Sequence, residues 1–140
     1  MKIKWLAVLL LVSTFAKAQT SDEQQIRSVL DTQRMAWNRG DIEGFMQTYL
    51  HSDSLMFIGK NGIQWGWQKT LENYKKSYPG AAAMGKLNFD LLVVKKLSDQ
   101  YYYVVGKWML TREAGDLSGH FDLLLQKING RWFIISDHSS

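Results

Sequence analysis

The chain has 140 residues, a formal net charge of +4 and no cysteine. It can therefore form neither disulfides nor zinc sites built on thiolates, and packing must stabilise its fold. Lys2, Lys4 and Lys17 lie in the first eighteen residues; without that segment, 14 basic and 13 acidic residues remain, a net charge of +1. Such a balance excludes the basic surface of a nucleic-acid-binding protein, so no nucleic-acid partner is predicted.

The first eighteen residues have the three parts of an export signal in order. Lys2 and Lys4 are followed by an apolar run over residues 5–15 and by Ala16-Lys17-Ala18, small residues suited to signal peptidase. The run is about half of the roughly 20 residues that a membrane-spanning helix needs. We expect residues 1–18 to be a cleaved signal peptide, and residues 19–140 to be a single domain in the periplasm or outside the cell, with no membrane span.

Three helices are predicted in the first half of the mature chain. Ser21 and Gln24 form a capping box for a helix that ends at Gly40, and Asp41 can cap a second, shorter helix reaching Tyr49. A third helix follows a short hairpin over residues 55–66 and ends at Pro79-Gly80. Residues 81–85 are expected to form a loop.

Four long strands are predicted after that loop, over residues 87–96, 101–113, 117–128 and 132–138. Their connections are short enough for an antiparallel meander. Apolar residues occupy both faces of these strands, whereas a half-solvated sheet alternates more cleanly. One face should pack on the helices, and we expect a second copy of the protein to cover part of the other face, giving a homodimer.

This order of elements resembles the nuclear transport factor 2-like superfamily, most closely the exported branch of its SnoaL-like and ketosteroid-isomerase-like proteins. The residues that carry the resemblance are Trp37-Asn38-Arg39-Gly40-Asp41, Gly106-Lys107-Trp108, Gly130-Arg131-Trp132 and Asp137-His138-Ser139. The resemblance implies an α+β fold, in which a cone-shaped, curved antiparallel sheet wraps on three N-terminal helices. It also implies an apolar pocket at the open end, and often a homodimer through the outer sheet face.

His120 and Asp122 are the candidate catalytic residues because they project from the same face of one strand. The last hairpin decides whether His138 joins them. A two-residue turn at Asn129-Gly130 would place Asp122 opposite Asp137, two facing carboxylates. A three-residue turn, the register we favour, places His120 opposite His138 and Asp122 opposite Ser136.

On the favoured register, His120, Asp122 and His138 share one patch of the sheet, and an odd loop in the preceding hairpin would bring Trp108 and Leu110 to the same face. A carboxylate can orient and charge a histidine, and apolar walls shift the pKa of both groups. The same residues could instead bind a ligand, or His120 could only bond strand backbone while Asp122 faces solvent. Asp137 and His138 cannot form a dyad directly, because adjacent strand residues point to opposite faces.

Further candidate pocket residues are aromatic or lie near the expected pocket mouth. Trp37 and Tyr49 sit on helix faces that should turn inward, Trp65 is spaced to line the far wall, and Arg112 could hold an anion or pair with Asp116. The predicted ligand-binding residues are Trp108, Tyr49, His138, Leu110, Trp37, Phe57 and Arg112.

The leading functional prediction is a pocket-bearing binding or accessory domain for a small, mostly apolar or aromatic molecule. The alternatives are a cofactor-free isomerase, dehydratase or cyclase that uses His120 and Asp122, and a structural or interaction homodimer. No metal and no cofactor are predicted, since export argues against nicotinamide nucleotides and the sequence has no phosphate-binding loop.

Overall fold

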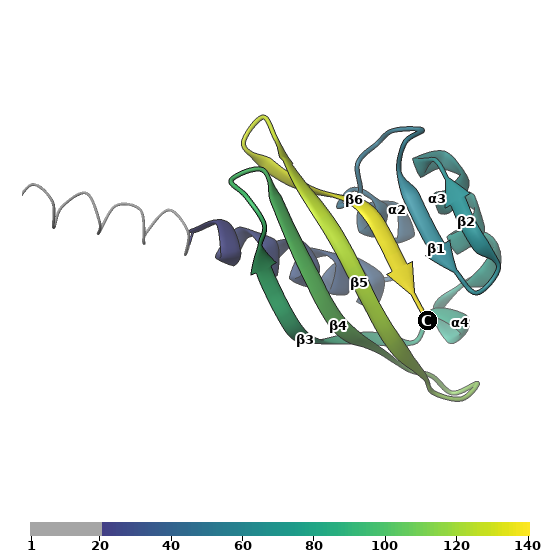
Figure 1. Cartoon of the computed structure of the whole chain (residues 1–140). Coiled ribbons are helices and arrows are strands. Elements are labelled where there is room, and N and C mark those ends of the chain that lie inside the picture. The colour runs from purple at the N-terminus through teal and green to yellow at the C-terminus, as the bar shows by residue number, and fades with distance from the viewer. Residues whose placement is uncertain (1–20) are drawn as a thin grey trace, which may run out of the picture.

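The computed structural model describes residues 21–140. The predicted signal peptide over residues 1–18 lies outside the described residues. The part described is an α+β fold in which helices cover one face of a curved, unclosed six-stranded sheet (Figure 1). No helix among residues 21–140 has the length and apolar character needed to cross a membrane.

The helical half follows the predicted order. The first helix covers residues 21–38 of the described chain, and α2 (Ile42–Met46) begins after Asp41, whose side chain accepts a hydrogen bond from the Gly44 backbone amide at 2.7 Å. This is the expected use of an aspartate at a helix N-cap. α2 ends before Tyr49, which instead bridges to the sheet beside Ile134.

The hairpin and the third helix are confirmed: β1 (Met56–Gly59) and β2 (Gly62–Trp65) are antiparallel, and α3 (Trp67–Ser77) follows them. The loop expected over residues 81–85 is wrong in part, because Ala81–Met84 form a single helical turn, α4. Alanine and methionine favour helix, and Gly85, with a φ of 60°, ends the turn.

The four long strands are β3 (Lys86–Lys96), β4 (Tyr101–Thr111), β5 (Leu117–Ile128) and β6 (Arg131–Ser139). They pair as an antiparallel meander, and the complete order is β2-β1-β6-β5-β4-β3. The sheet is mixed rather than wholly antiparallel, because β1 pairs with β6 in the parallel direction. The β1–β2 hairpin thereby extends the sheet over the helices.

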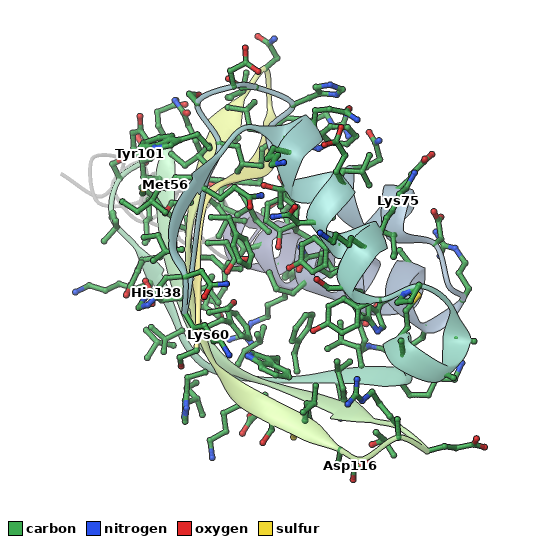
Figure 2. The ribbon with its side chains drawn as sticks, turned by 90° about the vertical axis from the view of Figure 1, so that its right-hand side faces the viewer. Met56, Lys60, Lys75, Tyr101, Asp116 and His138 are labelled. Carbon is green, nitrogen blue, oxygen red and sulfur yellow. The ribbon has the colours of Figure 1, made fainter. Side chains whose placement is uncertain are left out.

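The core lies between the concave face of the sheet and the helices, as the edge-on view of the sheet shows (Figure 2). Along β5, Phe121, Leu123 and Leu125 are buried, and the residues between them face the other side. The two faces of the sheet are thus defined, and we call them the inner and the outer face. Only the inner face is covered within the described chain.

Candidate functional site

A cavity of about 440 Å³ lies between the inner face of the sheet and the helices. Exposed lining residues from the β1–β2 turn and from α3, among them Lys60, Asn61 and Asn73, mark the side on which it meets solvent. Most of the wall is aromatic. The aromatic lining residues are Trp37, Phe45, Tyr49, Phe57, Tyr74, Tyr78, Phe89, Trp108 and Phe121.

The aromatic wall is held by edge-to-face packing around Trp37. Its ring centroid lies 4.9 Å from that of Tyr78, 5.2 Å from Phe45 and 5.9 Å from Tyr74. Its indole nitrogen donates to the backbone oxygen of Met84 at 2.9 Å, so the polar atom of this buried ring is satisfied. Such a wall presents a rigid apolar surface to a ligand.

A carboxyl group, that of Asp137, faces this apolar cavity. Asp137 is only 4% exposed; its Oδ2 accepts from the Tyr49 hydroxyl at 2.6 Å and its Oδ1 from the Ser139 hydroxyl at 2.9 Å. Tyr49 is brought there by the segment after α2, where the Leu50 amide donates to the Ile134 oxygen at 2.9 Å and the Ile134 amide to the Thr48 oxygen at 3.0 Å.

Burial raises the pKa of Asp137 to about 6, against the opposing effect of the hydrogen bonds from Tyr49 and Ser139. The nearby charge of Asp122 raises it further, and His138 acts in the opposite direction. A carboxyl with a pKa near 6 can both accept and donate a proton close to neutral pH. This is the property required of a general acid or base in a pocket.

The phenols beside Asp137 remain protonated. Burial, with an added effect of Asp137, raises the pKa of Tyr49 well above its usual range, and the same two causes raise that of Tyr74. Tyr49 uses its proton to bind Asp137. Tyr74 lines the cavity, and hydrogen bonding to Tyr49 opposes the increase in its pKa.

A β-bulge puts Asp137 on the inner face. Near the turn, Leu125 faces Ile134 and Gln126 faces Phe133, but farther along Leu124 faces Ser136, so Ile135 is the extra residue. Trp132 and Ile134 point inward before the bulge, and Asp137 does so after it. A regular strand would have turned His138 inward, because a shift of one residue exchanges the two faces.

The final hairpin therefore differs from the favoured prediction. The turn at Asn129-Gly130 is the two-residue form, with Ile128 opposite Arg131 and positive φ at both turn residues. The bulge then places Asp122 opposite His138, instead of opposite Ser136 or Asp137. Neither register drawn from the sequence allowed for a bulge.

The predicted candidates fall on both faces of the sheet. His138 lies on the outer face, away from the cavity (Figure 2). His120 and Asp122 lie on the same face, and His138 Nδ1 is 3.0 Å from Asp122 Oδ1. Trp108 and Leu110 do not share their face, because β4 and β5 pair with Lys107 opposite His120 and Trp108 opposite Gly119. The last pair before the turn is Leu110 with Leu117, so an even number of residues, 111–116, separates the paired residues instead of the odd number assumed.

Five of the predicted ligand-binding residues line the cavity: Trp37, Tyr49, Phe57, Trp108 and Leu110. Arg112 lies outside it, where its Nε donates to the Gly115 oxygen at 2.8 Å and its NH1 to the Ala83 oxygen at 3.2 Å. Asp116 accepts from the Arg112 backbone amide at 3.0 Å rather than forming an ion pair. Trp65 is 57% exposed on the outer face and lines no wall of the cavity.

The sequence analysis missed the buried polar residues of the cavity, which are Gln33, Thr70 and Asp137. Asp137 could have been found only by anticipating the bulge. Gln33 had a local signal, since it recurs at helical spacing between Leu30 and Trp37 on the inward stripe of the first helix. A polar residue in such a stripe is a candidate site residue.

No three His, Asp or Glu side chains come together as potential metal ligands anywhere in residues 21–140. The cavity has a single buried carboxyl, and the other polar lining residues supply hydroxyl and amide groups, with the lysine Lys60 at the exposed side. Such a set can bind an organic molecule and exchange a proton with it.

Comparison with known proteins assigns the family. Neither protein-family models nor curated proteins match this chain. Among solved structures, an NTF2-like protein of unknown function from Shewanella oneidensis is 41% identical, with 86% of this chain and 98% of that chain covered and a TM-score of 0.81. The chain therefore belongs to the NTF2-like family, where NTF2 stands for nuclear transport factor 2.

More distant structures have the same fold. A ketosteroid isomerase-like protein from Erwinia carotovora atroseptica is 20% identical, with 84% of this chain and 93% of that chain covered and a TM-score of 0.67. An NTF2-like superfamily protein from Salmonella enterica is 18% identical, with 87% and 92% covered and a TM-score of 0.69. At this identity the likeness concerns the fold alone.

Proposed function

We propose that this protein is an exported binding domain for a small, mostly apolar molecule, which it holds in the cavity between sheet and helices. The aromatic cavity with one buried carboxyl carries the proposal. A rigid apolar wall with few polar groups is the usual design of a small-molecule site. Export to the periplasm or the exterior rests on the signal pattern of residues 1–18.

Ethylnaphthalene is a suitable first probe, because it has no polar group and fits an aromatic wall. We expect it to quench tryptophan fluorescence, since Trp37 and Trp108 line the cavity. Leu123→Trp would fill the cavity from the inner face and should abolish binding, whereas Leu124→Trp on the outer face is the matched control. Binding that survives Leu123→Trp in a folded variant would contradict the proposal.

A second candidate function is proton transfer, with Asp137 in place of the predicted His120 and Asp122. The observation that favours it is the pKa of about 6 of a carboxyl that faces the cavity. A carboxylate of this kind can take a proton from a carbon next to a carbonyl group and return it at another carbon. An isomerase of this type needs no cofactor.

Proton transfer can be tested without the natural substrate. Acetylnaphthalene has exchangeable methyl protons next to its carbonyl group, and NMR in heavy water follows their replacement by deuterium. We expect the protein to accelerate the exchange, and Asp137→Asn to slow it by about a hundredfold or more. Asp122→Asn is the control. Equal rates for wild type and Asp137→Asn would exclude Asp137 as the base.

The outer face supports a homodimer. Ile63 and Trp65 are each 57% exposed, and register places Met56 beside Trp65 and Ile58 beside Ile63 on the same face. The row continues through His138 and Asp122 to Val105. The apolar side chains of β1 and β2 thus form a patch with the polar His138 and Asp122 at its border, and an exposed apolar patch with a polar border is of the kind that a second subunit covers.

Light scattering at micromolar concentration tests the dimer. We expect the mass of two chains for the wild type, and of one chain for a variant that combines Ile63→Ser with Trp65→Ser. Unchanged circular dichroism would show that the variant is folded. A monomeric wild type would overturn this part of the proposal and leave the cavity untouched.

A further inference from the structure

Gly59 is the one glycine of this chain that the fold does not explain. All eleven glycines lie within residues 21–140, and seven of them have a positive φ, which favours glycine. In three more, a Cβ atom would collide with a neighbouring residue: Gly44, Gly106 and Gly119. Gly59 has no positive φ, and beyond its adjoining residues a Cβ atom there would meet only the Phe57 ring, at 3.5 Å. The fold therefore tolerates a side chain at position 59.

The missing side chain at position 59 leaves part of the cavity wall bare. Gly59 and Phe57 are two residues apart on β1, so they face the same way, and both line the cavity. Glycine weakens a strand, because it loses more conformational entropy than other residues and has no side chain to pack. A strand glycine without a structural reason indicates that a ligand approaches the backbone closely at that point.

The bare wall lies at the mouth of the cavity. Lys60 and Asn61 form the turn after Gly59, and both are exposed lining residues. Because β1 runs parallel to β6, this turn and the end of β6 lie at the same end of the molecule (Figure 1). The exposed Asn73 and Ser77 of α3 also line the cavity. The mouth thus has a polar rim, whereas most of the wall is aromatic.

The two charged side chains of the lining lie in different environments. Asp137 is buried, whereas Lys60 is exposed and is the only cationic residue of the lining. The ionised Asp137 would repel a carboxylate of a ligand, and Lys60 would attract it. A mostly apolar acid is therefore oriented with its body inside the cavity and its carboxylate at the mouth.

We propose that Gly59 keeps the mouth open for an elongated ligand, whose chain crosses the bare backbone at Gly59 and brings a carboxylate to Lys60. The ligand class is then a mostly apolar carboxylic acid that reaches from the aromatic wall to the rim. This inference rests on the proposed binding function and specifies its ligand. Gly59 determines the length of molecule that the cavity admits, and Lys60 favours acids over neutral molecules.

Three probes with one aromatic body test chain length and charge separately: naphthylhexanoate, naphthylhexanol and ethylnaphthalene. In calorimetry at neutral pH, Gly59→Val should weaken binding of both long probes by about tenfold or more, because the added side chain occupies the path of their chains. Gly59→Ala should cause a smaller loss. Ethylnaphthalene should keep its affinity for both variants. Ile58→Phe, which adds bulk on the outer face, is the matched control and should leave all three affinities unchanged.

Stability separates this role of Gly59 from a structural one. Alanine and valine both cost a strand less than glycine does, so Gly59→Ala and Gly59→Val should each raise the thermal midpoint of the ligand-free protein. Higher stability together with weaker binding of the long probes is the expected result. A lower thermal midpoint in both variants would show that Gly59 serves the fold and would overturn the inference.

Lys60→Gln tests the acidic group. Wild type should bind naphthylhexanoate about two- to fivefold more tightly than naphthylhexanol, and added salt should reduce this preference, as for an exposed ion pair. Lys60→Gln should remove the preference. Lys69→Gln is the matched control, because Lys69 is exposed on α3 and does not line the cavity.

The possible failures are distinguishable. Full affinity of Gly59→Val for both long probes would overturn the role of Gly59, and equal affinity of wild type for acid and alcohol would overturn that of Lys60. Ethylnaphthalene binding in the same samples would leave the proposed function standing in either case. If none of the probes binds, both the proposed function and this inference fail.

Discussion

The inner and outer faces of the sheet carry similar chemical groups in opposite environments. On the inner face, Asp137 is buried against aromatic rings and bonded to Tyr49. On the outer face, Asp122 pairs with the half-exposed His138, the very next residue after Asp137. Burial, and not residue type, gives Asp137 a pKa of about 6. Neighbours in sequence can thus have unrelated roles when a sheet separates them.

The largest expected difference between the faces concerns packing. Leu123 is buried on the inner face and Leu124 is half-buried on the outer face. Leu123→Ala should lower the free energy of unfolding by about 2–5 kcal/mol, because it enlarges a cavity that already exists. Leu124→Ala should cost less than about 1 kcal/mol in the monomer. Urea denaturation of dilute protein measures both, and equal losses would show that the outer face is packed as tightly as the inner one.

The next effect is a dependence of stability on pH. The pKa of Asp137 is 3.8 in the unfolded chain and about 6 in the folded protein. As pH rises from about 4 to 6, the Asp137 carboxyl loses its proton in the unfolded chain before it does so in the folded protein. The free energy of unfolding therefore falls over this range, by an amount that approaches about 3 kcal/mol at neutral pH.

Asp137→Asn removes this titration. The variant should therefore gain stability relative to wild type between about pH 4 and 7, as measured by urea denaturation at each pH. Asp122→Asn should keep most of the wild-type pH dependence, because burial, the main cause of the raised pKa of Asp137, is unchanged and only the smaller effect of the Asp122 charge is lost. A constant difference between Asp137→Asn and wild type across this range would mean that Asp137 titrates normally.

A smaller effect is expected at Gln33, and its sign is informative. Leaving a buried donor unsatisfied costs about 1–3 kcal/mol, so Gln33→Met should raise the free energy of unfolding of the ligand-free protein by about 1 kcal/mol. The thermal midpoint measures this, with Gln25→Met as the control. A decrease in stability would indicate that the Gln33 amide makes a stabilising hydrogen bond in the folded protein, for which the Tyr49 hydroxyl oxygen is the neighbouring acceptor.

The smallest effect is expected for the contact between His138 and Asp122 on the outer face. The side chains of His138 and Asp122 are 51% and 36% exposed, and exposed pairs contribute about 0.2–1 kcal/mol. His138→Ala should therefore change stability by less than about 1 kcal/mol and leave ethylnaphthalene binding unchanged. Lost binding would show that the two faces are coupled through β6.

Much of the fold could be predicted because its signals are local. The apolar stripe from Ile26 to Trp37 indicated the first helix, and Asp41 indicated the N-cap of α2. The short turn segments indicated the meander of long strands. The short α4 and the parallel β1–β6 pair were missed. The first has only four residues, and the second joins segments far apart in the chain, so neither leaves a clear local pattern.

The candidate site was predictable in its aromatic part and not in its polar part. Trp37, Tyr49 and Trp108 line the cavity, as their places in helices and strands suggested. The polar candidates His120 and Asp122 are on the outer face, because their orientation depended on loop lengths and on strand register. A single inserted residue, Ile135, changed which side chain of the last strand faces the cavity.

The sequence by itself determined the kinds of elements, their order and the resemblance to one family, since periodicity, caps and turns act over a few residues. Only the tertiary structure decided which carboxyl is buried and which is solvated. That choice depends on how β5 and β6 pair across a bulge and on where the chain after α2 meets them. Desolvation, which shifts the pKa of Asp137, exists only once those distant segments have come together.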